Sequence, residues 1–298
     1  MQTFYSHGKL LITSEYLILK GAKGLAVPCN KGQFLKFKAT NSKNLNWKSY
    51  DFNNRIWFEA IFECKNFNYI KSNKKSISKS LSFILKETRK LNPKFLLTTG
   101  GEIKTQLEFD LNWGLGSSST LISNLAQLNK INPYKLLSNT YGGSGYDIAC
   151  SLVKRPIIYE IKNNNYDEIN FNPPFKDKLF FIYLNKKQNS KVEVDRFENI
   201  EVDEKTIKSI NSITEVISKT KEYDEFNFLI RTHEQIISNV INKTSVKKLK
   251  FKDFKGEIKS LGAWGGDFIL ASGDDSPSYF KSKGYKTIIK FDDMVYRR

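Results

Sequence analysis

The sequence predicts an α+β protein with two domains. Its 298 residues exceed the roughly 150 residues of an average domain, so the chain is long enough for two hydrophobic cores. Apolar side chains make up 40% of it and aromatic ones 13%, which is typical of globular rather than disordered protein. Segments with the period-2 alternation of strands are mixed with segments that have the spacing of helices.

The two periodicities predict the order of the elements. Two short strands are predicted on either side of Gly8 and Lys9. Further strands are predicted at residues 25–28, 34–38, 45–50, 56–62, 95–98, 103–109, 155–161, 179–184, 258–261, 268–271 and 285–291. Helices are predicted at residues 78–91, 121–128, 133–139, 204–218, 224–241 and 276–283. An Asn tract at 163–165 and the prolines at 173–174 predict domains of residues 1–172 and 173–298.

Charge and cysteine content limit the class of protein. The formal net charge is +17, but the lysines are spread along the chain and no nucleic-acid recognition module is visible. A solvated basic surface and a small anionic substrate are therefore favoured over a nucleic-acid partner. With no apolar run long enough for a membrane span and three cysteines in no paired motif, the sequence predicts a cytoplasmic protein without a membrane partner. A homodimer is a candidate assembly.

The clearest functional signal is a glycine-rich turn between a strand and a helix. Strand alternation ends at Phe109, and helical spacing begins at Leu121. Between them, Gly114 and Gly116 leave room for a ligand beside the backbone, and three serines follow. Because the free N–H groups of a helix start favour anions, the turn predicts a phosphate site. The alternative is a serine-capped helix, since neither the Walker A nor the dinucleotide spacing fits.

The turn resembles the central motif of the GHMP kinases, the superfamily of galactokinase, homoserine kinase, mevalonate kinase and phosphomevalonate kinase. Its residues 114–119 read Gly-Leu-Gly-Ser-Ser-Ser. The amino-terminal stretch is similar to the first motif of the same superfamily. Lys9 and Glu15 stand there at the family's spacing, while His7 replaces a proline and Ser14 a glycine. Judged alone, a lysine such as Lys9 is more often a surface lysine.

Two later stretches resemble the same family. The run Gly-Tyr-Asp-Ile-Ala at residues 145–149 is similar to the GYDIA-type form of the mevalonate kinase and phosphomevalonate kinase branch, in which the aspartate, here Asp147, faces the transferred phosphoryl group. Its alternative is an ordinary helix cap. Residues 262–266, Gly-Ala-Trp-Gly-Gly, resemble the third motif, with Trp264 in place of a glycine. The three motifs occur in the family's order.

The resemblance implies a two-domain GHMP kinase fold. Its amino-terminal domain is of the ribosomal protein S5 domain 2 type, and its carboxy-terminal domain is ferredoxin-like. It implies ATP and Mg²⁺ as cofactors, Lys9 and Asp147 as catalytic residues, and Ser118 as a Mg²⁺ contact. The ATP-binding residues implied are Gly114, Leu115, Gly116, Ser117, Ser118 and Ser119. The substrate-binding residues implied are Glu15, Ser144, Gly145, Lys186, Lys187, Ser190, Gly262, Gly265 and Gly266.

The acceptor is predicted from an absence. Mevalonate kinases as a family place a second Mg²⁺ carboxylate about eleven residues before the aspartate matched by Asp147; here that position is Leu136. A phosphate acceptor needs cations, and the loop containing Lys186 and Lys187 supplies them. It is otherwise explained as a surface loop. The sequence therefore predicts a phosphomevalonate-like acceptor, with mevalonate second. A catalytically idle relative and an RNA-binding protein are the rival classes.

Overall fold

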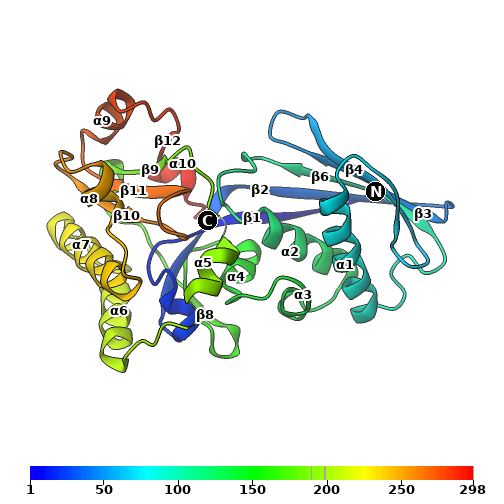
Figure 1. The fold of residues 1–298 in the computed structure, drawn as a ribbon, viewed down its shortest axis with the longest axis horizontal. Helices are drawn as coiled ribbons and strands as arrows, with labels where there is room; N and C mark the ends of the chain where they lie inside the picture. Colours follow the sequence, from blue (N-terminus) through cyan, green and yellow to red (C-terminus); the bar gives the residue numbers. More distant parts are fainter. Residues whose placement is uncertain (189, 198, 298) are drawn as a thin grey trace. The chain divides into compact units, whose positions relative to one another are not determined.

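The computed structural model describes residues 1–188, 190–197 and 199–297 (Figure 1). Residue contacts divide the chain into two units. Unit 1 consists of Met1–Gly8, Lys31–Leu111 and Gly116–Leu152, and unit 2 of Lys9–Asn30, Asn112–Leu115 and Val153–Arg298. The chain therefore passes between the units more than once, and the predicted boundary at residues 172 and 173 stays a prediction.

Unit 1 is built on a mixed sheet whose strand order is β5-β4-β3-β6-β2. The strands are β2 (Gly24–Thr40, from Lys31 onward in this unit), β3 (Asn44–Tyr50), β4 (Ile56–Glu63), β5 (Tyr69–Ser72) and β6 (Gly100–Leu107). β3 and β6 are parallel, and the other neighbours are antiparallel. Buried and more exposed residues alternate along β3, so one face of the sheet packs against the core.

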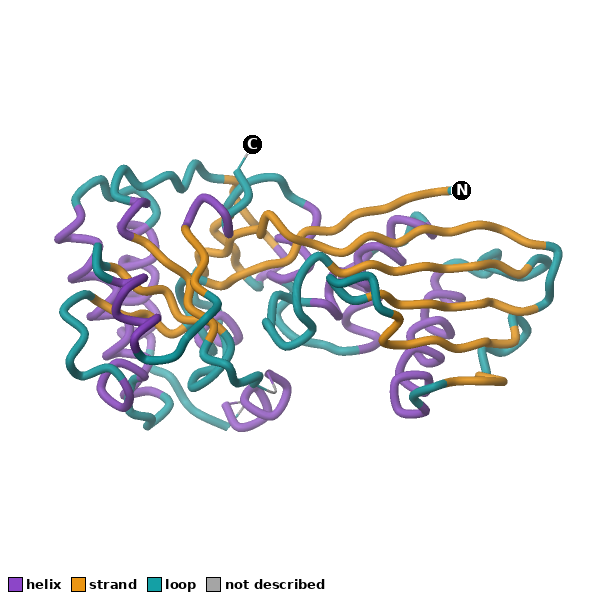
Figure 2. The backbone as a smooth tube through the Cα atoms, turned by 90° about the horizontal axis from the view of Figure 1, so that it is seen from above, coloured by secondary structure: helices purple, strands orange, loops and turns teal. Residues whose placement is uncertain are grey.

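The helices of unit 1 cover that face. Figures 1 and 2 show α1 (Lys75–Leu91), α2 (Ser117–Asn129) and α3 (Pro133–Thr140) on the same side of the strands. The short helix α4 (Tyr146–Leu152) packs against α2. The core between sheet and helices includes the buried side chains of Trp47, Phe62, Ile84, Ile122 and Leu136. This core fixes the start of α2, and with it the second half of the glycine-rich turn.

Unit 2 contains an antiparallel sheet in the order β10-β11-β9-β12. Its strands are β9 (Leu179–Tyr183), β10 (Glu257–Ser260), β11 (Phe268–Ser272) and β12 (Ile288–Lys290). Its helices are α5 (Ser190–Phe197), α6 (Glu204–Ile217), α7 (Tyr223–Val240), α8 (Val246–Lys250), α9 (Ser276–Ser282) and α10 (Phe291–Met294). The hairpin β7 (Ile157–Glu160) and β8 (Asn165–Glu168) pairs with the start of β2. Short 3-10 turns are η1 (Leu17–Lys20), η2 (Lys162–Asn164) and η3 (Lys176–Lys178).

Several predicted strands differ from the structure. The strand β1, Gln2–Leu11, continues through Gly8 and Lys9 instead of breaking there, and it pairs with β2. The strands predicted at 25–28 and 34–38 are likewise one strand, β2. The polar residue Ser6 is buried within β1, where its hydroxyl donates a hydrogen bond to Asn124 at 2.9 Å. The predicted strand at 95–98 is wrong, because Leu96 has a left-handed φ of 52° that no strand accommodates. Among the described residues, no helix is long and apolar enough to cross a membrane.

Candidate functional site

The second half of the central loop (residues 114–119) forms the start of α2 in unit 1. Gly116 precedes the helix with a left-handed φ of 87°, which glycine adopts without strain. The hydroxyls of Ser119 and Thr120 both donate to the Gly116 carbonyl, at 2.9 and 3.1 Å. No side chain at the cap position hydrogen-bonds the first N–H groups of the helix. These N–H groups are therefore oriented as an anion site requires.

A cavity of about 300 Å³ lies beside this helix start within unit 1. The loop residues Ser117 and Ser118 line one part of it, and the aromatic side chains of Trp57 and Tyr141 line others. Ser118 is exposed and hydrogen-bonds Tyr141. The volume is at the lower end of the range for small-molecule sites. The sequence did not predict Trp57 or Tyr141, because neither stands in a motif or near the loop in sequence.

A second hollow of unit 1 is larger, about 550 Å³, and it is lined by residues of β3, β4 and β6. None of the predicted site residues lines it. The smaller cavity is therefore the better candidate, because it adjoins the predicted anion site and the larger hollow does not.

Asp147 lies in the first turn of α4, also in unit 1. Its carboxylate accepts a hydrogen bond from the Ile148 N–H at 3.1 Å. The preceding Gly145 has a φ of 86°, and Ser144 is 8% exposed. The segment is thus a tight turn into a helix that packs against α2. Asp147 and the three serines of the loop belong to the same unit.

Lys9 is held against the first half of the central loop in unit 2. Its ammonium donates to the Gly114 carbonyl at 3.2 Å, and its backbone N–H donates to the Leu115 carbonyl at 3.0 Å. Strand β1 thus fixes both the main chain and the side chain of this lysine at the loop. Lys9 and Asp147 belong to different units, and their pairing stays a prediction.

The third-motif turn directs its one large side chain into the core of unit 2. The Trp264 side chain is 4% exposed and packs in a cluster with Tyr16, Phe197, Ile210 and Ile237. The Trp264 N–H donates to the Tyr16 hydroxyl at 3.0 Å. The indole, which stands where the family pattern has a glycine, fills space in the apolar core.

The glycines of this turn pack against the predicted lysine loop. A Cβ on Gly266 would lie 2.5 Å from Cγ of Gln188 and 2.6 Å from the Lys186 carbonyl oxygen. A Cβ on Gly265 would lie 3.2 Å from the Gln188 amide nitrogen, which donates to the Trp264 carbonyl at 3.0 Å. Gly262 has a φ of 61° with open space around it. The glycines at 265 and 266 are therefore required by contacts inside the protein.

The loop after β9 presents Lys186 and Lys187 as exposed side chains. Asn189 lies outside the described residues, and so do the side chains of Ser190 and Lys191 in α5. The described part of the loop is hydrogen-bonded to the third-motif turn, since Lys186 O accepts from the Asp267 N–H at 2.7 Å. Substrate contact by these lysines and by Ser190 stays a prediction.

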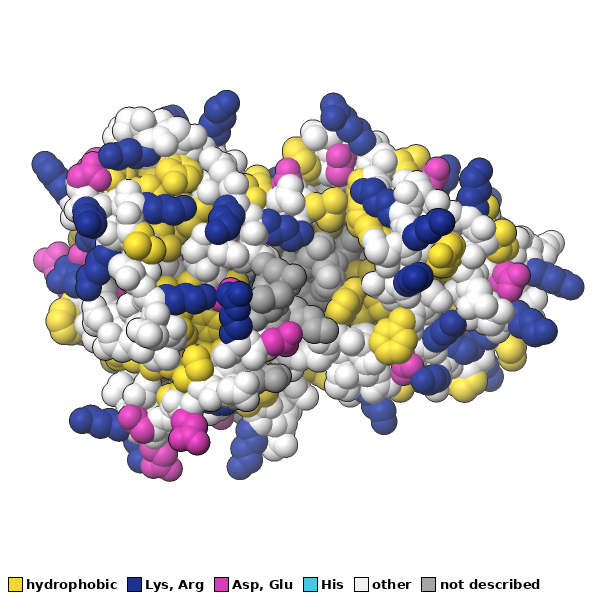
Figure 3. Space-filling model, viewed as in Figure 1, with side chains coloured by type: hydrophobic (Ala, Val, Ile, Leu, Met, Phe, Trp, Pro, Cys, Tyr) yellow, Lys and Arg dark blue, Asp and Glu magenta, His cyan; other side chains and the backbone are white. Residues whose placement is uncertain are grey.

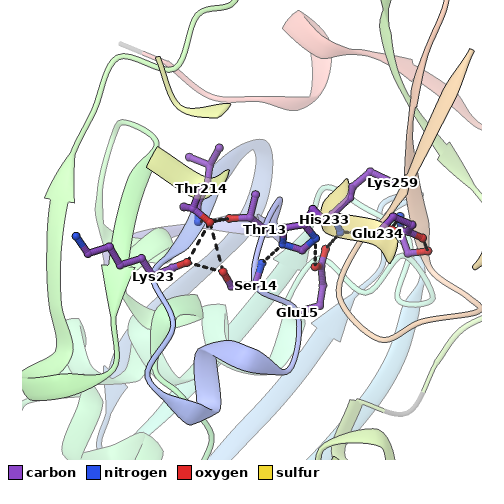
Figure 4. Close-up of polar contacts among 10 residues, drawn as sticks. Thr13, Ser14, Glu15, Lys23, Thr214, His233, Glu234 and Lys259 are labelled. Atoms are coloured by element: carbon purple, nitrogen blue, oxygen red, sulfur yellow. Dashed lines mark hydrogen bonds and ion pairs between the residues drawn. The ribbon is translucent and has the colours of Figure 1, made fainter. Parts of the chain in front are cut away.

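Glu15 belongs to a buried charged network in unit 2, shown in Figure 4. Its carboxylate forms an ion pair with Lys259 of β10, and both side chains are fully buried. Lys259 also donates to the Ser260 carbonyl at 2.7 Å and lies 3.6 Å from the carboxylate of Glu234. Burial raises the pKa of Glu15 to about 7, while Lys259 opposes the shift. In this structure Glu15 faces protein groups, and its contact with a substrate stays a prediction.

His233 on α7 completes this network, and its side chain is fully buried. The Ser14 N–H donates to Nε2 at 2.8 Å, so the neutral ring carries its proton on Nδ1. Burial and the nearby Lys259 hold the pKa of His233 well below its usual value, so the ring is neutral. Nδ1 faces the second oxygen of Glu15 at 3.8 Å, too far for a hydrogen bond.

The metal prediction rests on few protein ligands. Within residues 1–188, 190–197 and 199–297, no group of three or more His, Cys, Asp or Glu side chains could hold a metal ion. The residue at the position of the mevalonate kinase carboxylate is Leu136 of α3, and its side chain is fully buried. Mg²⁺ commonly binds enzymes through one or two protein ligands and the substrate's phosphates, and the exposed Ser118 at the anion site fits such an arrangement.

Comparison with solved structures identifies the fold. The chain superposes on Methanococcus jannaschii mevalonate kinase with a TM-score of 0.72 and 14% identity, over 97% of this chain and 98% of that one. Streptococcus pneumoniae phosphomevalonate kinase, solved with phosphomevalonate and AMPPNP, gives 0.69 and 16% over 98% and 100%. Lactococcus lactis galactokinase, solved with galactose, gives 0.70 and 13% over 99% and 94%. The chain therefore has the GHMP kinase fold, and the predicted fold class is confirmed.

Comparison of the amino-acid sequence, unlike comparison of the structure, finds no match. No protein-family model matches the chain, and no curated protein matches it in sequence. The likeness is therefore one of fold and of three short motifs.

We predict that Glu15 and Lys259 are energetically coupled. Each single change, Glu15→Gln or Lys259→Met, should lower the free energy of unfolding by about 3 kcal/mol, because it takes the nearest oppositely charged group away from a buried charge. The double variant should lose less than the sum of the two by about 1 to 3 kcal/mol. Urea unfolding of the four proteins measures this coupling.

The matched control is the exposed pair Glu204 and Lys208 on α6. Glu204→Gln should leave the urea midpoint nearly unchanged, because exposed ion pairs contribute little. If the losses in the free energy of unfolding caused by the Glu15 and Lys259 changes simply add in the double variant, the two residues are not energetically coupled.

Proposed function

We propose that this protein is an ATP-dependent small-molecule kinase that transfers the γ-phosphoryl group of ATP to a phosphomevalonate-like acceptor. The observation that carries the proposal is the uncapped start of α2 with a cavity directly beside it. An anion site next to an aromatic-lined cavity fits a nucleotide, whose phosphates and base need these two environments. The fold shared with mevalonate kinases and galactokinase supports the same activity.

The chain's own residues supply binding and charge for this reaction. The backbone of residues 114–119 binds the triphosphate, and Ser118 contacts Mg²⁺. Lys9, already fixed at the Gly114 carbonyl, offsets charge that develops on the transferred group. In the family's pattern, Asp147 faces the transferred phosphoryl group. ATP with Mg²⁺ supplies the phosphoryl group, and its transfer needs positioning and electrostatic stabilisation rather than a covalent intermediate.

Two observations support a phosphate-bearing acceptor. Lys186 and Lys187 are exposed on a loop that is hydrogen-bonded to the third-motif turn. The position of the mevalonate kinase carboxylate is a buried leucine, Leu136. A phosphate acceptor with a second pKa near 6 is largely ionised at neutral pH, so it needs cations more than a general base.

The burial of Trp264 bears on the idle-relative alternative. That alternative gained weight from a bulky residue in a glycine turn. Since the indole packs with Tyr16 and Phe197 in the core, it leaves the turn's backbone free for a ligand. Lys9, Ser118 and Asp147 are also retained. An active kinase is therefore the better proposal.

We predict that Gly116→Val abolishes thermal stabilisation by Mg-ATP. A valine at a φ of 87° distorts the start of α2 and so removes the anion site. Differential scanning fluorimetry with and without Mg-ATP measures the effect. Gly284→Val is the matched control, because Gly284 has a φ of 86° and an added Cβ would meet no atom within 4 Å. The backbone strain is therefore similar, but the central loop is left unchanged. Equal stabilisation of both variants would remove the central loop from the site.

Lys9→Met should lower turnover by about a hundredfold while ATP still binds. The change removes a fixed positive charge that matters most in the transition state. Steady-state ADP release measures turnover, and isothermal titration measures ATP affinity. Lys104→Met, an exposed lysine of β6, is the control and should retain wild-type turnover. Wild-type turnover in the Lys9 variant would make Lys9 a surface lysine.

The values of kcat/KM should distinguish phosphomevalonate from the other candidate acceptors. We expect a higher value for phosphomevalonate than for mevalonate, with homoserine and galactose lower still. Replacing Lys186 and Lys187 by Gln should raise KM for phosphomevalonate and leave KM for mevalonate nearly unchanged, because only the former carries a phosphate for them to bind. A clearly higher kcat/KM for mevalonate would contradict the acceptor assignment and leave the kinase assignment standing.

A further inference from the structure

The cavity beside the start of α2 has an exposed rim and a buried floor. The rim is formed by exposed residues, namely Ser76, Ser80, Ser118 and Tyr141. The floor is formed by buried residues of the sheet and of α1, namely Gln33, Trp47, Ser49, Phe58, Leu81, Ile84 and Thr105. Because the central loop meets the cavity at the rim, a triphosphate bound at the predicted anion site leaves the floor for another part of the nucleotide.

Gln33 of β2 places an unused hydrogen-bond donor on this floor. The residue is 4% exposed, and its side-chain oxygen accepts from the Thr120 hydroxyl at 2.8 Å. Its main-chain carbonyl accepts from the Asn124 side chain at 2.9 Å, so α2 holds the residue at two points. The amide nitrogen of Gln33 has no hydrogen-bond partner in the described part of the chain. Its two N–H groups are therefore left for a ligand.

Ser49 of β3 supplies a second unused donor. Its hydroxyl oxygen accepts from the Trp47 indole N–H and from the Thr105 hydroxyl, both at 2.9 Å. A serine hydroxyl has two lone pairs and one hydrogen, so both lone pairs are occupied and the hydrogen remains. No acceptor for this hydrogen lies among the described residues. The floor thus presents free donors from two strands of one sheet.

The charge of the lining limits what these donors can bind. The chain has a net charge of +17, yet no described residue that lines the cavity is charged. A phosphate on the floor would give up its water without gaining a cation, which is costly. The acceptor that fits is therefore uncharged. A ring nitrogen of a nucleotide base is such an acceptor, and it brings no donor of its own that needs a partner.

Trp57 gives the cavity an aromatic wall because of a bulge in the sheet. The pairing of β3 with β4 joins Ser49 to Phe58 and Tyr50 to Ile56, so Trp57 is the extra residue between them. A bulged residue departs from the alternation of its strand, and Trp57 and its neighbour Phe58 accordingly both line the cavity. A flat ring beside the donors suits a flat base.

We propose that Gln33, with Ser49 as a second donor, recognises the adenine base of ATP by donating hydrogen bonds to its ring nitrogens. The base lies on the floor beside Trp57, and the triphosphate lies at the rim against the start of α2. The inference deepens the proposed kinase function and rests on it. It assigns base recognition to residues that stand in none of the three motifs.

Two variants of the full chain test the role of Gln33. Gln33→Met keeps the length of the side chain and removes both N–H groups. The Thr120 hydroxyl retains the Gly116 and Ser117 carbonyls as acceptors, so this variant should fold. Gln33→Glu keeps an oxygen for Thr120 and puts a second acceptor in place of the amide nitrogen.

The matched control is Gln106→Met on β6. Gln106 does not line the cavity, and its amide nitrogen already donates to the carbonyls of Asp51 and Leu107. ATP should therefore bind this control as tightly as it binds wild type.

Isothermal titration in the presence of Mg²⁺ compares ATP with inorganic tripolyphosphate, which has no base. ATP should bind Gln33→Met about tenfold more weakly than wild type, the usual effect of one hydrogen bond. Gln33→Glu should bind ATP more weakly still, because an acceptor then faces an acceptor. Tripolyphosphate should bind wild type and Gln33→Met alike. Equal weakening of ATP and tripolyphosphate in Gln33→Met would overturn the proposal, since Gln33 would then act on the anion site through Thr120.

ATP analogues that lack one ring nitrogen identify the acceptor. Of 1-deaza-, 3-deaza- and 7-deaza-ATP, at least one should bind wild type about tenfold more weakly than ATP and lose nothing further in Gln33→Met. Full wild-type affinity for all three analogues, or a full further loss in Gln33→Met, would overturn the inference. Turnover of ATP by the same wild-type protein would leave the kinase proposal standing. A wild-type protein that shows the expected affinities and phosphorylates no acceptor would refute the kinase proposal alone.

Discussion

The ion pair between Glu15 and Lys259 is the constraint on which unit 2's part of the site depends. A fully buried lysine requires an anion, and here the anion comes from the segment directly after β1. The pair therefore ties the first motif to the strand that leads into the third. His233 and Glu234 of α7 close the network, so three elements distant in sequence are fixed together.

Space around the motif turns explains which departures from the family pattern the fold tolerates. Trp264 can replace a glycine because its side chain is directed into an apolar cluster. Gly114 and Gly266 cannot be replaced in the same way, since a Cβ would meet the Asp267 carboxylate or the Gln188 side chain. The direction of each side chain, rather than its size, decides the outcome. The Lys and Arg side chains spread over the surface in Figure 3 extend into solvent, so no neighbouring atom limits their size.

The sequence predicted what is local and missed what is assembled across the chain. The helices α2, α6 and α7 were predicted, because periodicity is a property of neighbouring residues. Trp57, Lys259 and Asp267 were not, because their partners lie far away in sequence. The strand predicted at 95–98 failed for a related reason: the apolar residues Phe95 and Leu96 are buried by a turn in the core. The roles of the predicted site residues remain proposals.

For the proposed kinase, one cation in a fixed place contributes more to catalysis than additional mobile lysines do. Lysines that attract the nucleotide equally before and during transfer tighten binding without raising kcat. A cation held at one place by a carbonyl group is different, because it can be aimed at charge that appears only in the transition state. The Gly114 carbonyl holds the Lys9 ammonium in this way. The chain has a net charge of +17, so positive charge is abundant. What the proposed site requires in addition is a cation held in a fixed position.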